Sequence, residues 1–193
     1  MTDKTFNIAI AGATGAVGET LLSILKERKF PIGELVPLAS ERSAGSKVEF
    51  GNRSITVKNL ADYDFNGIDI AFFSAGGSVS RTHVPRAADA GAIVIDNTSE
   101  FRYQPDVPLV VSEVNPHAIE QYRARGIIAN PNCSTMQLLV ALAPIHRAVG
   151  IERINVATYQ SVSGTGHRAL EELGRRTAAL PNCQSVEPKV YPV

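Results

Sequence analysis

Cys133 lies in the segment 130–135 (NPNCST), at the turn between an apolar run and an amphipathic segment. The residues that follow, 135–149, have the spacing of a helix that ends before Gly150. Unpaired backbone N–H groups and the positive end of the macrodipole at a helix start both stabilise a thiolate. A thiolate can attack a carbonyl carbon, so the pattern predicts a nucleophilic cysteine. The alternative is that Cys133 is a small buried hydrophobic residue, as most free cysteines are structural.

A glycine-rich turn near the N-terminus predicts a dinucleotide site. The apolar run Phe6–Ala11 is typical of a strand, residues 12–18 read GATGAVG, and residues 19–28 have the pattern of a helix. Glycines at 12, 15 and 18 allow a tight turn, a close approach of the backbone to a pyrophosphate, and close packing of helix on strand. The spacing is GxxGxxG instead of the commoner GxGxxG, and a tight turn without a ligand is the alternative.

The end of the second predicted strand, residues 35–39, bears on which dinucleotide binds. At roughly this distance from the glycines an NAD site usually carries an acidic residue for the ribose hydroxyls. Here the sequence reads Ser40-Glu41-Arg42-Ser43. A guanidinium offers a planar fork to phosphate oxygens, so Arg42 between hydroxyl groups favours NADP. Glu41 could instead bind a ribose diol, and a solvated charged turn is a further alternative.

Composition and charge narrow the class of protein. The 193 residues are 44% hydrophobic, enough for a buried core, and the formal net charge is +0 at pH 7. A neutral chain without a basic patch gives no reason to expect nucleic acid or an anionic membrane as partner. No apolar run reaches the length of a membrane span and the first residues lack an apolar signal core, so a cytoplasmic protein is expected. The two cysteines and four histidines lack metal-ligand spacing, so no metal site is expected.

Apolar runs and helical patterns alternate along the chain. Expected strands are residues 6–11, 35–39, 68–74, 92–96, 109–111 and 127–129, with a hairpin of 48–50 and 54–57. Expected helices are residues 19–28, 116–125, 135–149 and 168–180, together with a segment that is capped by Ser78 or Ser80 and runs to Ala90. In the helix at 135–149, the residues expected in the core are Met136, Leu139, Val140 and Ala143. The alternation predicts an α/β protein with a doubly wound parallel sheet of the Rossmann type. Residues 154–159 are expected to be a strand of a second sheet, followed by a glycine-rich loop at 160–166.

Together these motifs resemble the aspartate-β-semialdehyde dehydrogenase family, in its bacterial NADP-dependent branch. The resemblance covers essentially the whole chain and rests on five segments in the family's order and approximate spacing: residues 12–18, 40–43, 99–102, 130–135 and 159–166. The related N-acetyl-glutamyl-phosphate reductases share the glycine turn and a cysteine nucleophile but typically have Gly before that cysteine, so Asn132 favours the first family. The implied organisation is a dinucleotide-binding domain at 1–130, followed at 131–193 by the start of an α+β catalytic and dimerisation domain.

The resemblance implies reduction of L-aspartyl-4-phosphate to L-aspartate-4-semialdehyde by NADPH, reversible with phosphate, in the biosynthesis of lysine, threonine, methionine and diaminopimelate. Cys133 would attack the acyl phosphate, and the resulting thioester would take a hydride from NADPH. Family matching gives Arg102 the phosphate-binding role, Gln160 the role of orienting substrate and intermediate, and Asn132 a part in holding phosphate or the developing oxyanion. The matched cofactor contacts are Gly12, Thr14, Gly15, Ala16, Val17, Gly18, Ser40, Arg42, Ser43, Ser163 and Gly164.

One departure from the family concerns the C-terminal end. Family members continue with a segment that supplies a general acid/base histidine and an arginine for the substrate carboxylate, whereas this sequence ends at Val193. The chain is therefore expected to be truncated relative to the family. Two function classes stay open: a reductive enzyme, a homodimer when full length, and a catalytically silent NADP-binding fragment.

Overall fold

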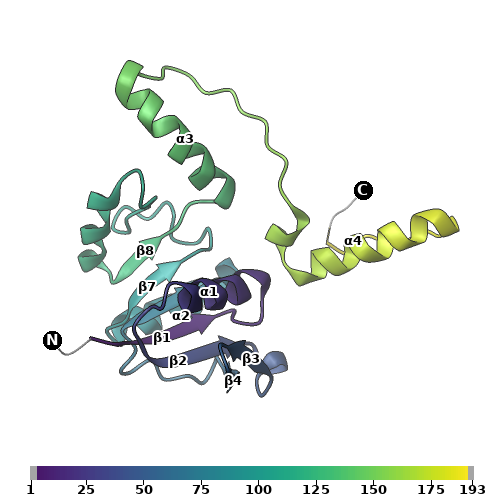
Figure 1. Ribbon diagram of the computed structural model, residues 1–193, viewed down its shortest axis with the longest axis horizontal. Helices are drawn as coiled ribbons and strands as arrows, with labels where there is room; N and C mark the ends of the chain where they lie inside the picture. The colour runs from purple at the N-terminus through teal and green to yellow at the C-terminus, as the bar shows by residue number, and fades with distance from the viewer. Residues whose placement is uncertain (1–3, 191–193) are drawn as a thin grey trace. The chain divides into compact units, whose positions relative to one another are not determined.

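The computed structural model describes residues 4–190, with His167 described by its backbone alone. The chain forms two compact units, the first ending at Ile154 and the second beginning at Asn155. The first unit is built on a parallel six-stranded sheet with the order β5-β2-β1-β6-β7-β8 (Figure 1). Its strands are β1 (Phe6–Ala11), β2 (Ile32–Ala39), β5 (Lys58–Asn59), β6 (Ile70–Phe73), β7 (Ile93–Asp96) and β8 (Ile127–Ala129). This sheet confirms the predicted Rossmann-type architecture.

The strand order reverses between β1 and β6. From β1 the chain builds outward through β2 and β5, and it then returns to the other side of β1 to add β6, β7 and β8. In open α/β sheets the crevice at such a reversal, beyond the carboxyl ends of the strands, is the usual ligand position. The topology therefore points to the segments that follow β1 and β6.

Helices α1 (Ala16–Glu27) and α2 (Gly77–Asp89) pack on opposite faces of the sheet. Successive strand residues face opposite sides, so Ile10 of β1 packs with Leu22 of α1 while the preceding Ala9 packs with Val84 of α2. These four side chains are at most 3% exposed. Fully burying a large aliphatic side chain contributes about 1.5–3 kcal/mol, so the two cores fix α1 and α2 at the strand ends.

The short elements follow the sequence pattern in part. The predicted hairpin is confirmed as β3 (Lys47–Phe50) and β4 (Arg53–Thr56). The predicted strand at 109–111 is wrong, because only Leu109 forms an isolated bridge, to Ala129. The predicted helix at 116–125 is the 3₁₀ helix η2 (Pro116–Ala124). Neither Ser78 nor Ser80 caps α2, whose N-cap is Gly76 with a φ of 99°.

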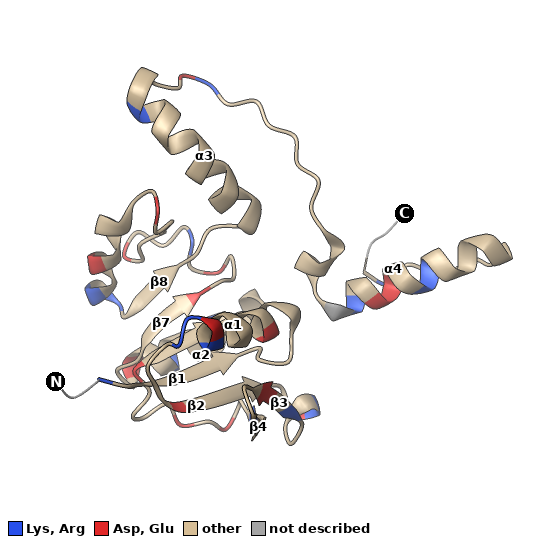
Figure 2. Cartoon of the chain, in the orientation of Figure 1, with Lys and Arg blue, Asp and Glu red and all other residues tan. Residues whose placement is uncertain are grey.

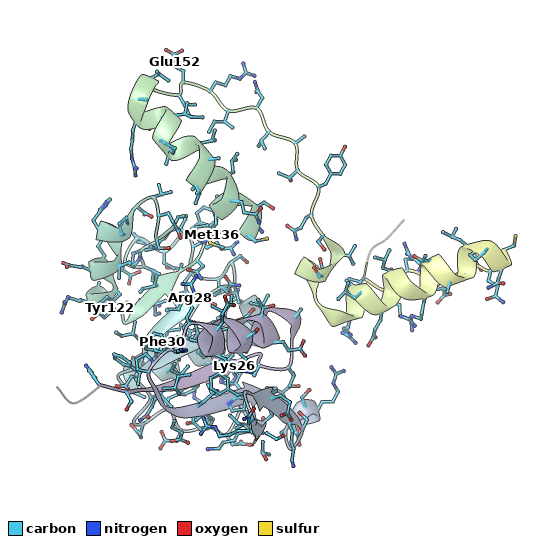
Figure 3. All side chains as sticks on the ribbon, viewed as in Figure 1. Lys26, Arg28, Phe30, Tyr122, Met136 and Glu152 are labelled. Atoms are coloured by element: carbon cyan, nitrogen blue, oxygen red, sulfur yellow. The ribbon has the colours of Figure 1, made fainter. Side chains whose placement is uncertain are left out.

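Helix α3 (Cys133–Val149) begins two residues before the predicted start at residue 135, and its apolar residues are not in the core as was expected. Met136, Leu139 and Ala143 are half-buried and Val140 is 45% exposed. The reason is that no other described helix or strand packs along α3, whose side chains stand out around its axis (Figure 3). Arg147 is the one Lys, Arg, Asp or Glu residue of α3 (Figure 2). It donates from Nη2 to the carbonyl oxygen of Val114 over 2.9 Å.

The second unit contains η3 (Val162–Thr165), α4 (His167–Ala179) and η4 (Leu180–Asn182). Helix α4 confirms the helix predicted at 168–180. Its Glu172 is 1% exposed and accepts hydrogen bonds from the backbone N–H groups of Lys189 and Val190, at 2.8 and 2.7 Å. The predicted strand at 154–159 is wrong: these residues have no strand assignment, since no described segment pairs with them. Among the described residues, no helix has the length and apolar character needed to cross a bilayer.

Candidate functional site

The candidate site lies at the carboxyl edge of the parallel sheet. Because all six strands run the same way, the segments that follow β2, β1, β6, β7 and β8 emerge at one edge. Backbone hydrogen bonds of 2.8–2.9 Å tie the first residue after four of these strands to the end of its neighbour: Gly12 to Leu38, Ser74 to Ala11, Asn97 to Phe73 and Asn130 to Asp96. The predicted site segments of the first unit are therefore brought into one row.

The glycine turn, residues 12–18, follows β1 and leads into α1. Gly12 has a φ of 91°, and a Cβ added to it would lie 2.8 Å from the carbonyl oxygen of Ser74. A Cβ on Gly18 would collide with the backbone of Gly12 and Ala13. Gly15 is the N-cap of α1 and provides no side-chain cap. The first N–H groups of α1 are thus left for an anion, which is what a pyrophosphate site requires.

Residues 74–77 (SAGG) form part of the same edge and were not among the predicted site residues. They follow β6, and Ser74 and Ala75 lie against Gly12 across the strand-order reversal. Two consecutive glycines between a buried strand and a helix were the signal in the sequence, since this arrangement repeats that of the glycine turn. Ser74 and Ala75 therefore lie directly beside the glycine turn at this edge of the sheet.

Residues 40–43 follow β2 and form the short 3₁₀ helix η1 (Glu41–Ser43). Ser40, Glu41 and Arg42 are exposed and Ser43 is half-buried. None of the hydrogen bonds and ion pairs described for the chain involves the side chain of Arg42. Its guanidinium is therefore available to a ligand at the end of β2, and so is the carboxylate of Glu41.

The cysteine turn, residues 130–135, connects β8 to α3. Asn132 is the N-cap of α3, and its Oδ1 accepts a hydrogen bond of 2.9 Å from the backbone N–H of Ser134. The Cys133 thiol is exposed and lies 3.8 Å from the same oxygen. The exposure shows that the alternative of a buried structural cysteine is wrong. The asparagine oxygen is directed to the helix start, so its amide N–H groups are left as donors beside the thiol.

Arg102 is brought to the cysteine turn from the segment after β7. Its Nε donates to the carbonyl oxygen of Asn130 over 2.8 Å, and its Nη2 donates to the carbonyl oxygen of Asn97 over 3.1 Å. The side chain is half-buried and forms no ion pair with any described residue. A guanidinium has five N–H donors, so most of them and the full positive charge remain for an anion next to the cysteine turn.

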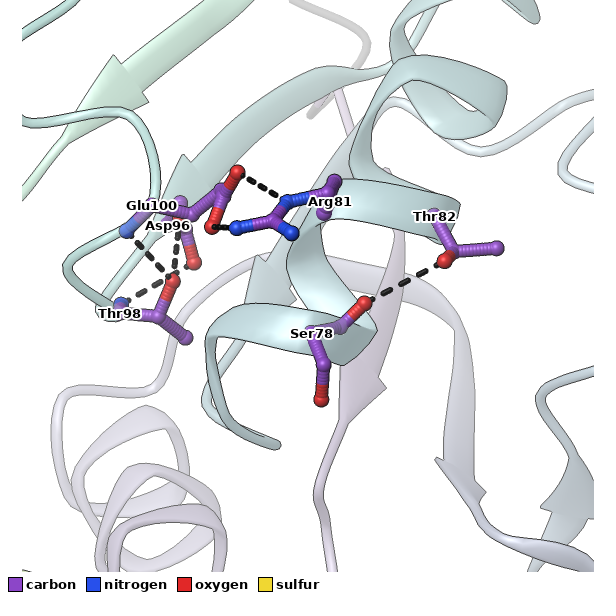
Figure 4. Close-up of polar contacts among 6 residues, drawn as sticks. All are labelled: Ser78, Arg81, Thr82, Asp96, Thr98 and Glu100. Carbon is purple, nitrogen blue, oxygen red and sulfur yellow. Dashed lines mark hydrogen bonds and ion pairs between the residues drawn. The ribbon is translucent and has the colours of Figure 1, made fainter.

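Glu100, two residues before Arg102, forms an ion pair with Arg81 of α2. Nε and Nη2 of Arg81 donate to the two carboxylate oxygens over 2.7 and 3.0 Å (Figure 4). These hydrogen bonds hold the pKa of Glu100 below its ordinary value. The negative charge near Arg102 is thus already neutralised by Arg81.

Gln160, Ser163 and Gly164 lie together in one turn of the second unit. Ser163 shares a hydrogen bond of 2.8 Å with Ser161, and Nε2 of the exposed Gln160 lies 2.7 Å from the position that a Cβ on Gly164 would take. A glycine is required there for the glutamine side chain to fold back over the turn. Within the described residues no group of three His, Cys, Asp or Glu side chains could hold a metal ion.

A sheet of this order, with a glycine turn at its reversal, defines a dinucleotide-binding protein. Residues 7–122 match the family model described as semialdehyde dehydrogenase, NAD binding domain, and residues 142–193 match that described as semialdehyde dehydrogenase, dimerisation domain. The chain therefore belongs to the semialdehyde dehydrogenase family, and it contains that family's NAD(P)-binding domain and part of a dimerisation domain.

Its relatives are aspartate-semialdehyde dehydrogenases, as the motifs predicted. Aspartate-semialdehyde dehydrogenase 2 of Vibrio cholerae is 58% identical over 188 residues, which is 97% of this chain and 56% of the relative. The crystal structure of aspartate semialdehyde dehydrogenase II complexed with ASA from Vibrio cholerae superposes with a TM-score of 0.95 at 56% identity, covering 98% of this chain and 56% of that one. Aspartate semialdehyde dehydrogenase with NADP from Candida albicans has a TM-score of 0.64 at 28% identity, covering 77% and 48%. The chain thus spans about half the length of its relatives.

Proposed function

We propose that this chain carries the cofactor-binding and nucleophilic part of an aspartate-semialdehyde dehydrogenase, which interconverts L-aspartyl-4-phosphate and L-aspartate-4-semialdehyde with NADPH. The observation that carries the proposal is the contact between Arg102 and the backbone of Asn130, which puts an unpaired guanidinium beside the turn that bears Cys133. A thiol nucleophile beside a guanidinium that can bind a phosphate group suits an acyl phosphate better than a free acid or an ester.

The glycine turn and residues 40–43 are the proposed NADP site. The backbone at Gly12, Gly15 and Gly18 leaves no room for side chains at 12 and 18 and leaves the N–H groups at the start of α1 for the pyrophosphate. The matched contacts Thr14, Ala16 and Val17 lie in the same turn, and Ser40, Arg42 and Ser43 lie at the end of β2, where an NADP 2′-phosphate would sit. When bound, NADPH supplies the hydride that reduces the thioester.

The nucleophilic step is proposed for Cys133. The N-terminus of α3 stabilises the thiolate, whose sulfur bonds to the acyl carbon while the bond from that carbon to the phosphate oxygen breaks and phosphate leaves. Arg102 holds the phosphate through its remaining N–H donors, and the amide N–H groups of Asn132 hold the phosphate or the oxyanion. Gln160 is proposed to orient the substrate and the thioester, with Ser163 and Gly164 as further cofactor contacts.

The assembly is proposed to be a homodimer in the cytoplasm, formed by the full-length protein. The support is the match of residues 142–193 to a dimerisation domain. The domain boundary at residue 130 remains a prediction.

A second candidate function is a catalytically silent NADP-binding fragment. This chain spans 56% of the first relative's length, so cofactor binding and turnover are tested separately. General acid/base assistance contributes typically about 10²–10⁴-fold, so a chain without such a group would bind the cofactor and turn over slowly.

NADPH formation from aspartate semialdehyde and NADP, with and without phosphate, separates the two candidates. Turnover that requires phosphate and disappears in Cys133→Ser supports the dehydrogenase. NADP binding by calorimetry without such turnover supports the fragment. Absence of NADP binding contradicts both.

A further inference from the structure

A buried carboxylate lies at the junction of the two turns that form the proposed anion site. Asp96, the last residue of β7, is 0% exposed, and no Lys or Arg among the described residues forms an ion pair with it. Its Oδ1 accepts from Oγ of Ser80 over 2.8 Å and from the backbone N–H of Thr98 over 3.1 Å, and its Oδ2 accepts from Oγ1 of Thr98 over 2.8 Å. Burying a charge without a counter-ion is costly unless hydrogen bonds offset the lost hydration. An aliphatic residue would fill the volume but could not hold these donors.

The three hydrogen bonds fix the start of the arginine turn, residues 97–102. Thr98 in turn accepts at Oγ1 from the backbone N–H of Glu100 over 3.3 Å (Figure 4). Ser80 is 0% exposed on α2, so the carboxylate ties the turn to a helix as well as to β7. The turn closes where Nη2 of Arg102 meets the carbonyl oxygen of Asn97.

The backbone of Asp96 holds the other turn. Its carbonyl oxygen accepts from the backbone N–H of Asn130 over 2.8 Å, and Asn130 provides the carbonyl oxygen that Arg102 binds. One residue therefore contacts the cysteine turn through its main chain and the arginine turn through its side chain.

We propose that Ser80, Asp96 and Thr98 form a positioning cluster that fixes the guanidinium of Arg102 against the cysteine turn. None of the three is a proposed substrate contact; they act through Arg102. The inference rests on the proposed function for the statement that Arg102 binds phosphate, but the placement of the guanidinium can be measured without it.

The direct test is hydrogen exchange at Nε of Arg102, observed by ¹⁵N NMR on the whole 193-residue chain and assigned with Arg102→Lys. Thr98→Val keeps the shape of the side chain and removes the hydroxyl, so the hydrogen bond from that hydroxyl to the Asp96 carboxylate is lost. Exchange at Nε of Arg102 should then rise by on the order of tenfold or more. Ser80→Ala should act in the same direction from the helix side. Thr98→Ser, which keeps the hydroxyl, should restore the parent rate.

Thr82→Val is the matched control. Thr82 is exposed on α2, the helix that carries Ser80, and within residues 4–190 its hydroxyl bonds only to the carbonyl oxygen of Ser78, over 3.3 Å (Figure 4). The same chemical change at Thr82 should therefore leave Arg102 unaffected. The backbone N–H of Ile10, in the core of β1, reports global opening, and its exchange should rise by a much smaller factor than the exchange at Arg102 in each variant. Parent-like exchange at Arg102 in both Thr98→Val and Ser80→Ala overturns the proposal, as does an increase matched at Ile10.

A second measurement connects the cluster to function. Inorganic phosphate should slow the alkylation of Cys133 by iodoacetamide in the parent, and about tenfold more phosphate should be needed in Thr98→Val. If phosphate has no effect on the parent, the proposed role of Arg102 fails, while the exchange experiment still decides the positioning role. If phosphate protects parent and Thr98→Val equally, the positioning proposal fails and the proposed function stands.

Discussion

Arg102 donates a hydrogen bond of 2.8 Å to the backbone carbonyl of Asn130, a residue 28 positions away that begins the cysteine turn. The bond crosses from the segment after β7 to the segment after β8, so a cation that follows one strand contacts the turn that bears the thiol after the next strand. Parallel pairing of β7 with β8 makes this possible, because the two carboxyl ends lie side by side.

Arg102→Lys should abolish most of the phosphate protection of Cys133. A lysine ammonium is a point charge with three donors and cannot hold two carbonyl oxygens in a planar fork while it binds an anion. We expect a loss of about 1.5–3 kcal/mol, or roughly 10- to 150-fold in phosphate affinity. Arg147→Lys, which also removes a hydrogen bond to a backbone carbonyl, should leave phosphate affinity unchanged.

The two thiols should react at different rates although both are exposed. Cys133 is the first residue of α3, where the macrodipole favours an anion, whereas Cys183 follows α4 and η4, where the terminal carbonyl groups disfavour one. Brief labelling with iodoacetamide at neutral pH and peptide mapping should show faster labelling of Cys133. Equal or faster labelling of Cys183 would remove the support for an activated Cys133.

Gly12→Ala should destabilise the first unit and abolish dinucleotide binding. A φ of 91° costs a non-glycine residue about 1–3 kcal/mol, and the Cβ would also lie 2.8 Å from the backbone of Ser74, an overpacking that costs roughly 1–3 kcal/mol more. Gly91→Ala is the matched control, since its φ is 95° but nothing lies within 4 Å of the added Cβ. Urea unfolding should therefore show a larger loss for Gly12→Ala than for Gly91→Ala, and equal losses contradict the steric part.

The sequence was sufficient for elements whose signal is local. Phe6–Ala11 was predicted to the residue, because a buried parallel strand is a continuous apolar run ended by glycine. The helix after the cysteine turn was predicted from the amphipathic run at 135–149, and it begins two residues earlier, at Cys133. Contacts between distant residues could not be read in this way. Ser80 was predicted as a possible helix cap, yet its buried hydroxyl donates to Asp96. Residues 154–159 were predicted as a strand, although no described strand pairs with them. An apolar pattern shows that a segment can pair but not whether a partner exists.

Stability should depend on pH through the pair formed by Glu100 and Arg81. The hydrogen bonds from Arg81 lower the pKa of Glu100 in the folded state, so the unfolded state binds more protons as the pH falls. The stabilisation is therefore complete above the unfolded pKa of about 4.3 and is lost as the pH drops through the lower folded value. Arg81→Met should be less stable than the parent at pH 7, and the difference should shrink below about pH 4.

Lys58→Met is the control for this pH dependence. Lys58 pairs with Glu34 at 3.8 Å, and both side chains are more than half exposed, so its removal should change stability little at any pH. Thermal unfolding from pH 3 to pH 7 gives the comparison. A difference between Arg81→Met and the parent that stays constant over this range contradicts the prediction.

Cofactor preference should depend on Arg42. Its exposed guanidinium lies in η1 at the end of β2 and forms none of the described hydrogen bonds or ion pairs, so it is available to the 2′-phosphate that distinguishes NADP from NAD. Calorimetric titration should show tighter binding of NADP by the parent. Arg42→Ala should lose about 1.5–3 kcal/mol of NADP affinity with NAD affinity unchanged. Arg53→Ala, which removes an exposed arginine from the adjacent hairpin, should keep the parent preference. If the parent binds both cofactors equally, Arg42 does not bind the 2′-phosphate. If Glu41→Gln then weakens the binding of NAD alone, the ribose diol is the group that this turn recognises.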